Sequence, residues 1–198
     1  ALSLLNRAGD AGADIICLPE YLNAMGQDDA FWQAPPPAHQ QDLLGLVAEL
    51  ARRHATYVIL PLLIGGASGN RNTALLLDRK GTVVGSYDKT HLTAVERQDQ
   101  GVQPGSSYPV FDVDFGRIGM MTCYDGHFPE VARILALQGA EVIFFPSLQR
   151  RLTAEAVDLQ VRCRALDNCV HIARASYGTP DDTTWMPGMT PGKSCIVD

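Results

Sequence analysis

Helix-like and strand-like segments alternate along this chain, and their order is what most limits the fold it can adopt. Short apolar runs typical of buried strands occur at residues 14–18, 57–64, 141–145 and 170–175. Apolar side chains at helical spacing occur in residues 2–8, 39–54, 128–137 and 153–167. Two hairpin patterns interrupt the alternation, at residues 73–87 and 109–122. This order predicts an α/β (α+β layered) fold with a mixed sheet.

The remaining segments read as loops and show no repeat or domain linker. Residues 27–38, 88–108 and 178–192 are polar or rich in proline and glycine, and a last short strand begins near residue 194. Pro129 suits the first turn of one helix, and Thr153 is a capping residue for another. The sequence therefore predicts one domain over residues 1–198.

Charge and cysteine usage exclude several classes of protein. The 198 residues carry 16 Lys plus Arg against 22 Asp plus Glu, a net charge of −6, which argues against a nucleic-acid binder. No apolar run is long enough to cross a membrane, and no secretory signal is visible. Four scattered cysteines, without zinc-site spacing, read as buried reduced thiols: Cys17, Cys163, Cys169 and Cys195. We therefore predict a cytoplasmic protein with no metal, no membrane association and no nucleic-acid partner.

Three chemically capable residues each follow a predicted strand. Glu20 follows strand 14–18, Lys89 follows the second strand of the first hairpin, and Cys123 follows an apolar strand just before a helix. Active sites collect at strand ends of this kind, and a helix N-terminus favours the thiolate. On spacing alone, however, Cys123 fits a core position, and Glu20 and Lys89 fit the surface, at least as well.

Together, these three residues indicate a possible reaction mechanism, which none of them indicates alone. A partly buried glutamate can take the proton of a thiol, and a lysine ammonium can hold the negative oxygen of a tetrahedral intermediate. His127 lies too close to Cys123 in sequence to be a good base for it, which leaves a cysteine–histidine pair as the weaker alternative.

At this point the chain resembles a known family. The segments LPEYL, YDKTHL and GMMTCYDGHFPEVARILALQGAEVIFFPS are together similar to the nitrilase superfamily of carbon–nitrogen hydrolases, in that family's order of Glu, Lys and Cys. The cysteine segment is the most specific part. RCRALDN and GKSCIVD resemble two further family stretches, with Asp167 where the family usually has Glu.

The resemblance implies a catalytic role for each strand-end residue. Glu20 would be the general base, Lys89 would stabilise the tetrahedral intermediate, and Cys123 would form an acyl-thioester. The backbone N–H of Tyr124 would complete the oxyanion hole, and Glu96 falls where many members carry a second glutamate. No cofactor is implied, and the partners are a small amide and water.

The substrate class follows less directly. Tyr124 and Asp125 after the cysteine resemble the amidase and N-carbamoyl amide branches, whereas nitrilases usually carry Trp-Glu there. A nitrilase and a catalytically silent binding or assembly module remain the alternatives. Candidate substrate-binding residues are Tyr21, Asn23, His127 and Trp185.

The resemblance also refines the expected architecture. It implies an α-β-β-α sandwich with two mixed β-sheets, and a homo-oligomer, a dimer or larger. Against the family pattern, the first strand and the C-terminal segments are expected to be lacking from residues 1–198.

Overall fold

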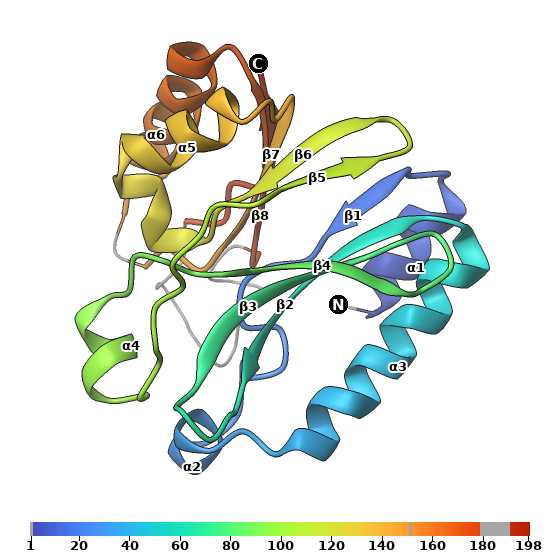
Figure 1. Ribbon diagram of the computed structural model, residues 1–198, viewed down its shortest axis with the longest axis vertical. Helices are drawn as coiled ribbons and strands as arrows, with labels where there is room; N and C mark the ends of the chain where they lie inside the picture. Colours follow the sequence, from blue (N-terminus) through green and yellow to red (C-terminus); the bar gives the residue numbers. More distant parts are fainter. Residues whose placement is uncertain (1, 151, 179–190) are drawn as a thin grey trace. The chain divides into compact units, whose positions relative to one another are not determined.

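The computed structural model describes residues 2–150, 152–178 and 191–198. The chain forms two compact units, residues 1–105 and residues 106–198, and each contains one mixed β-sheet (Figure 1). The predicted α/β fold with two mixed sheets is therefore confirmed.

The first unit contains a four-stranded sheet in the order β1-β2-β3-β4. The strands are β1 (Ile15–Cys17), β2 (Tyr57–Ile64), β3 (Arg71–Leu77) and β4 (Val83–Asp88). Strands β1 and β2 are parallel, and the other two pairs are antiparallel. The helices of this unit are α1 (Leu2–Asp10), α2 (Asp29–Gln33), α3 (Pro37–His54) and α4 (Ala94–Gln98).

One apolar cluster joins the two longer helices of this unit to its sheet. Leu5 of α1, together with Val47 and Ala51 of α3, is buried against Val58 and Leu60 of β2. The apolar stripe of each helix supplies these contacts, because residues three or four apart share a helix face. The packing fixes β1 beside β2, and with it the place where the chain leaves β1.

The first hairpin depends on a glycine. Gly81 has φ +74°, and a Cβ there would lie 2.3 Å from the carbonyl oxygen of Ala48 in α3. Any side chain would therefore clash with backbone in addition to straining the turn. The hairpin in turn sets where β4 ends and Lys89 begins.

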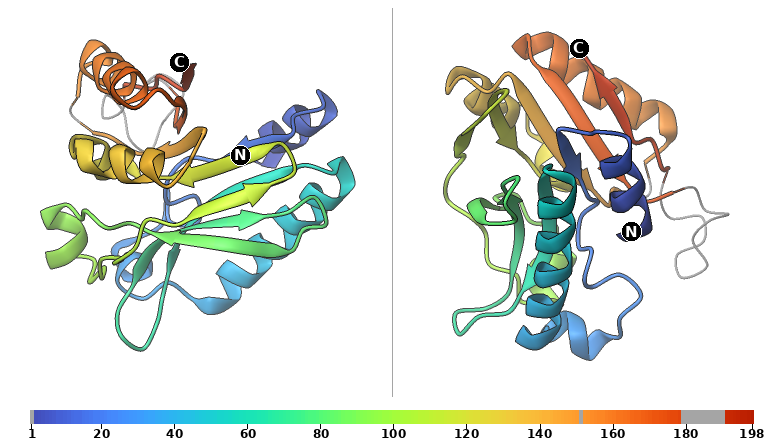
Figure 2. Two further views of the ribbon diagram at one scale, coloured as in Figure 1. Left: turned by 45° about the horizontal axis from the view of Figure 1, so that its top comes forward. Right: turned by 90° about the vertical axis from the view of Figure 1, so that its right-hand side faces the viewer.

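The second unit contains a five-stranded sheet in the order β5-β6-β7-β8-β9. The strands are β5 (Val110–Val113), β6 (Gly116–Met120), β7 (Val142–Ser147), β8 (His171–Ser176) and β9 (Cys195–Val197). Strands β6, β7 and β8 are parallel, and β5 and β9 pair antiparallel at the edges. Between them come the 3₁₀ segment η1 (Cys123–His127) and the helices α5 (Pro129–Leu137) and α6 (Ala154–Asn168), which lie side by side (Figure 2).

The core of the second unit lies under these two helices. Val131 and Leu135 of α5 and Val157 and Val161 of α6 are fully buried against Ile143 of β7. Pro129 occupies the first turn of α5, and the hydroxyl of Thr153 accepts the backbone N–H of Ala156 at the start of α6. Both predicted helix starts are therefore confirmed.

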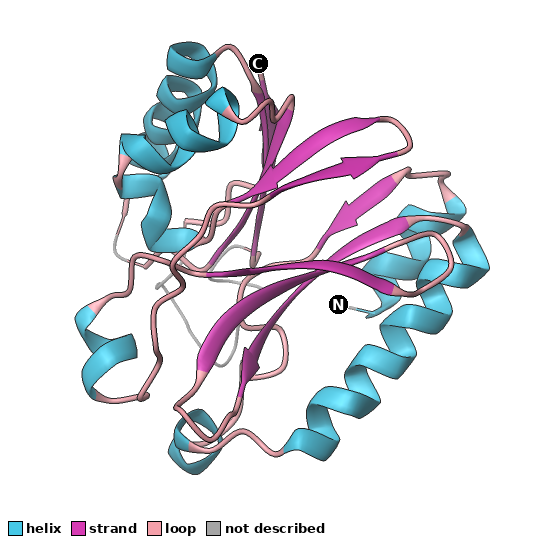
Figure 3. Cartoon of the chain, in the orientation of Figure 1, coloured by secondary structure: helices cyan, strands magenta, loops and turns pink. Residues whose placement is uncertain are grey.

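Two short helices and the burial of four cysteines differ from the predictions. Helices α2 and α4 lie in segments predicted as loops, and each has only five residues, too few to show a helical period (Figure 3). All five cysteines are thiols, as expected, but Cys17, Cys163 and Cys195 are only partly buried, and Cys169, the left-handed residue that ends α6, is exposed. None of the helices described is long and apolar enough to cross a membrane.

Candidate active site

The ends of two strands, together with helix α4, bring polar side chains together inside the first unit. After β1 the chain still follows β2, since the N–H groups of Leu18 and Leu22 donate to the carbonyls of Ile59 and Pro61. Glu20 lies between these two contacts. Lys89 directly follows β4, and its N–H donates to the carbonyl of Asn72 in β3 at 2.9 Å.

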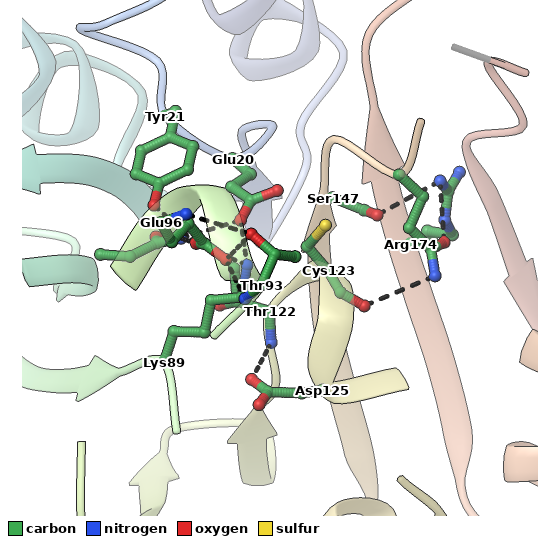
Figure 4. Close-up of polar contacts among 12 residues, drawn as sticks. Glu20, Tyr21, Lys89, Thr93, Glu96, Thr122, Cys123, Asp125, Ser147 and Arg174 are labelled. Carbon is green, nitrogen blue, oxygen red and sulfur yellow. Dashed lines mark hydrogen bonds and ion pairs between the residues drawn. The ribbon is translucent and has the colours of Figure 1, made fainter. Parts of the chain in front are cut away.

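Lys89 is buried between two carboxylates. Its Nζ lies 2.9 Å from Oε1 of Glu20 and 2.8 Å from Oε1 of Glu96, and Lys89 and Glu20 are each 1% exposed (Figure 4). A buried charge is costly unless it is paired and hydrogen-bonded, and here each charge is both. The structure thus brings together Glu20, Lys89 and Glu96, three of the residues named from the sequence.

Glu96 is held by hydrogen bonds on both of its carboxylate oxygens. Its Oε1 accepts hydrogen bonds from Lys89 Nζ, from Nδ2 of Asn72 at 3.1 Å and from the hydroxyl of Tyr21 at 2.6 Å. Its Oε2 accepts the backbone N–H and the hydroxyl of Thr93, at 2.8 and 2.9 Å, and so caps α4. Burial alone would raise the pKa of Glu96, but the Lys89 charge and these hydrogen bonds lower it to about 2. Glu96 is therefore a fixed anion at neutral pH.

Tyr21 and Asn23, two of the residues predicted to bind substrate, both have protein partners. Tyr21 has a left-handed backbone (φ 57°), and its ring packs edge-on against Trp32. Burial and the neighbouring Glu96 raise the pKa of Tyr21 well above its usual value, so the phenol stays a donor. The amide of Asn23 bonds the backbone N–H and carbonyl of Leu63.

Cys123 begins η1, directly after β6, in the second unit. Its backbone is left-handed (φ 48°) and its side chain is buried. The backbone N–H of Thr122 donates to Oδ2 of the fully buried Asp125 at 2.8 Å, which holds the turn (Figure 4). A non-glycine residue in this conformation is uncommon and is typical of strained functional positions.

A buried polar network also reaches the backbone of Cys123. Arg174 of β8 donates to the hydroxyl of Ser147 and to Oε1 of Gln149, both at 3.3 Å. The amide of Gln149 donates to Oε1 of Gln160 at 2.6 Å and lies 3.5 Å from the carbonyl oxygen of Cys123. These side chains support the segment that carries the thiol.

The other residues predicted from the sequence lie on or beyond η1. The ring of Tyr124 packs against those of His127 and Phe128, at centroid distances of 5.0 and 5.4 Å. Partial desolvation and the positive Arg164 lower the pKa of His127. Trp185 lies outside the described residues.

The sequence reasoning missed the roles of Asn72, Asp125, Gln149 and Arg174. Asn72 lies among the polar residues that begin β3 (RNTALLL), so the sequence alone does not mark it as buried. Arg174 lies in a strand with several polar residues (HIARAS), and its burial is likewise seen only in the structure. Among the described residues, no group of three or more His, Cys, Asp or Glu side chains is arranged to hold a metal ion.

Comparison with known proteins identifies the same family across the whole chain. The model of the carbon–nitrogen hydrolase family matches residues 1–198. Omega-amidase NIT2-B of Xenopus laevis is 30% identical over 94% of this chain and 70% of its own length. Deaminated glutathione amidase of Mus musculus is 32% identical over 98% of this chain, which spans 64% of that relative.

Solved structures share the fold. An amidase from Nesterenkonia sp. matches 99% of this chain and 75% of its own with a TM-score of 0.85 at 23% identity. The NitFhit protein of C. elegans matches all of this chain and half of its own, with a TM-score of 0.85 at 25% identity.

Proposed function

The chain belongs to the carbon–nitrogen hydrolase family, the nitrilase superfamily, and from this membership we propose that it cleaves the carbon–nitrogen bond of a small amide through a thioester on Cys123. The amidase-type relatives support this choice of bond. The observation that carries the proposal is the buried lysine shared by two glutamates, since such a charge cluster is costly to keep without a function.

The low pKa of Glu96 favours Glu20 as the base. Glu96 accepts five hydrogen bonds and its low pKa makes it a poor proton acceptor. Glu20 shares the donors Lys89 and Asn72, which bond its Oε1. Glu96 then serves as the permanent counter-ion that keeps Lys89 charged.

Each step of the proposed reaction moves one proton. Glu20 takes the thiol proton, and the thiolate of Cys123 attacks the amide carbon. The ammonium of Lys89 and the N–H of Tyr124 hold the resulting oxyanion. Glu20 returns its proton to the nitrogen, the carbon–nitrogen bond breaks, and ammonia or an amine leaves. Glu20 next takes a proton from water, which attacks the thioester; the carbon–sulfur bond then breaks, and Glu20 returns the proton to the sulfur, which restores the thiol.

The proposal is tested by ammonia release from acetamide, propionamide, glutaramate and N-carbamoyl-β-alanine, with propionitrile as the nitrile. We expect turnover of at least one amide and a loss of roughly 10³-fold or more in Cys123→Ala, because the nucleophile is removed. Cys169→Ala is the matched control, since Cys169 is an exposed thiol.

Three outcomes would overturn parts of the proposal. Ammonia release unaffected by Cys123→Ala would exclude the thioester route. Faster conversion of propionitrile than of any amide would make the chain a nitrilase. No turnover, together with alkylation of Cys123 by iodoacetamide no faster than that of Cys17 or Cys195, would indicate a silent binding module. Turnover of N-carbamoyl-β-alanine alone would narrow the substrate to N-carbamoyl compounds.

A further inference from the structure

Asn72 is a buried residue whose amide touches both carboxylates of the charge cluster. Its Nδ2 lies 2.8 Å from Oε1 of Glu20 and 3.1 Å from Oε1 of Glu96, and the residue is 1% exposed. These are the same two oxygens that Lys89 binds. The two anions are thus bridged twice, once by an ammonium and once by an uncharged amide.

The position of Asn72 in the sheet explains this placement. Asn72 pairs with Leu63 of β2 on one side, and its carbonyl accepts the N–H of Lys89 on the other. The amide is therefore anchored by the strand itself, and it lies beside the lysine that it assists. A side-chain amide offers two N–H donors without adding charge, and here one is used for each carboxylate.

The oxygen of the Asn72 amide indicates a role beyond stability. Oδ1 of Asn72 is buried and has no hydrogen-bond partner among the described residues. A buried acceptor without a partner is destabilising, and such groups in folded proteins call for an explanation. The two N–H donors of the side chain therefore account for an asparagine at this position, although its acceptor oxygen Oδ1 has no hydrogen-bond partner among the described residues.

We propose that Asn72 is a positioning residue of the reaction, which holds the carboxylate of Glu20 in place beside Lys89 while Glu96 remains the fixed partner of Lys89. This inference rests on the proposed role of Glu20 as the base. Without the hydrogen bond from Asn72, the Glu20 carboxylate loses a donor that fixes its orientation, and a misplaced base transfers protons more slowly.

The test compares Asn72→Ser and Asn72→Leu with the wild type in the full chain. We expect kcat on the best amide of the panel to fall about tenfold in Asn72→Leu with KM little changed, and Asn72→Ser, which keeps one donor, to lose less. Alkylation of Cys123 by iodoacetamide, followed by peptide mass spectrometry, is expected to slow in the same order, because the base that forms the thiolate is misplaced. The alkylation measurement needs no substrate.

Asn70→Ser is the matched control. Asn70 is a second buried asparagine nearby, and its amide donates to the backbone carbonyls of Trp32, Gln33 and Gln100. We expect this variant to lose stability without changing kcat or the alkylation rate of Cys123.

The outcomes separate this inference from the proposed function. Unchanged kcat and Cys123 alkylation in the Asn72 variants, with Cys123→Ala inactive, would overturn the role of Asn72 alone. Activity retained in Cys123→Ala would overturn the proposed function, and the alkylation rates would still decide whether Asn72 acts on the thiol through Glu20. Failure of both Asn72 variants to fold would also count against the inference, because Asn72 would then be needed for the fold itself.

Discussion

At the scale of single residues, hydrogen bonds fix the role of Glu96 in the buried cluster. Glu96 has donors on both oxygens and a pKa lowered to about 2, and it shares Lys89 and Asn72 with Glu20. Strand ends and family resemblance were enough to name Glu20, Lys89 and Glu96 from the sequence. Asn72 could not be named, because its role depends on which strand lies beside β4, and that is a tertiary fact.

Replacing Glu96 with Gln should make the free energy of unfolding less dependent on pH in the acidic range. Ionised Glu96 has a pKa of about 2 in the folded chain against 4.5 ordinarily. Its contribution is therefore fully present above about pH 4.5 and is lost as the pH falls towards 2. We expect Glu96→Gln to lower the free energy of unfolding on the order of 3 kcal/mol at pH 7.

Urea unfolding of both proteins at pH 7, 5, 4 and 3 would check this. The gap between wild type and Glu96→Gln should shrink steadily below about pH 4.5. The control is Glu49→Gln, since Glu49 pairs with Arg52 on the surface and should have little effect. A gap that stays constant down to pH 3 would show that Glu96 does not titrate as described.

At the scale of elements, long periodic segments were predicted well and short capped ones were not. The helix expected at 153–167 is observed as Ala154–Asn168, and the strand expected at 57–64 as Tyr57–Ile64. Helix α4 was missed because its five residues are defined by the reciprocal cap between Thr93 and Glu96, not by an apolar stripe. The left-handed conformation of Cys123 could not be predicted either, since a glycine would have indicated it and a cysteine does not.

The turn at η1 depends on Asp125. Asp125→Ala would leave the buried N–H of Thr122 without this acceptor, so we expect a loss of at least about 2 kcal/mol in the free energy of unfolding. Asp125→Asn keeps an acceptor oxygen and should lose less. Chemical denaturation at pH 7 measures both, with the exposed Asp112→Ala as the control. Equal losses in the Ala and Asn variants would mean that the charge matters, not the bond to Thr122.

At the scale of the whole molecule, the residues of the proposed triad come from both compact units. Glu20 and Lys89 belong to residues 1–105, and Cys123 belongs to residues 106–198. The order of the three motifs along the chain could be recognised from the sequence, but a division between two units could not, because no linker composition marks residue 105. Homo-oligomerisation stays a prediction, which light scattering would check.

If the two units share one reaction, a substitution in the first unit must alter the reactivity of the Cys123 thiol in the second. We expect Glu20→Gln to slow alkylation of Cys123 by iodoacetamide at least about tenfold at pH 7, because the base that forms the thiolate is lost. Peptide mass spectrometry would measure the rate, with exposed Cys169 as the internal control. An unchanged Cys123 rate, with Cys169 also unchanged, would mean that Glu20 does not act on this thiol.

The double use of Glu96 has a consequence for loop engineering. One carboxylate both starts α4 and balances the charge of Lys89, seven residues earlier. The segment from Lys89 to Gln98 must therefore be exchanged as one structural unit. A loop grafted from another protein would succeed only if it brought its own glutamate, with a Ser or Thr three residues before it to cap the helix. That glutamate would also have to lie within hydrogen-bonding distance of the lysine.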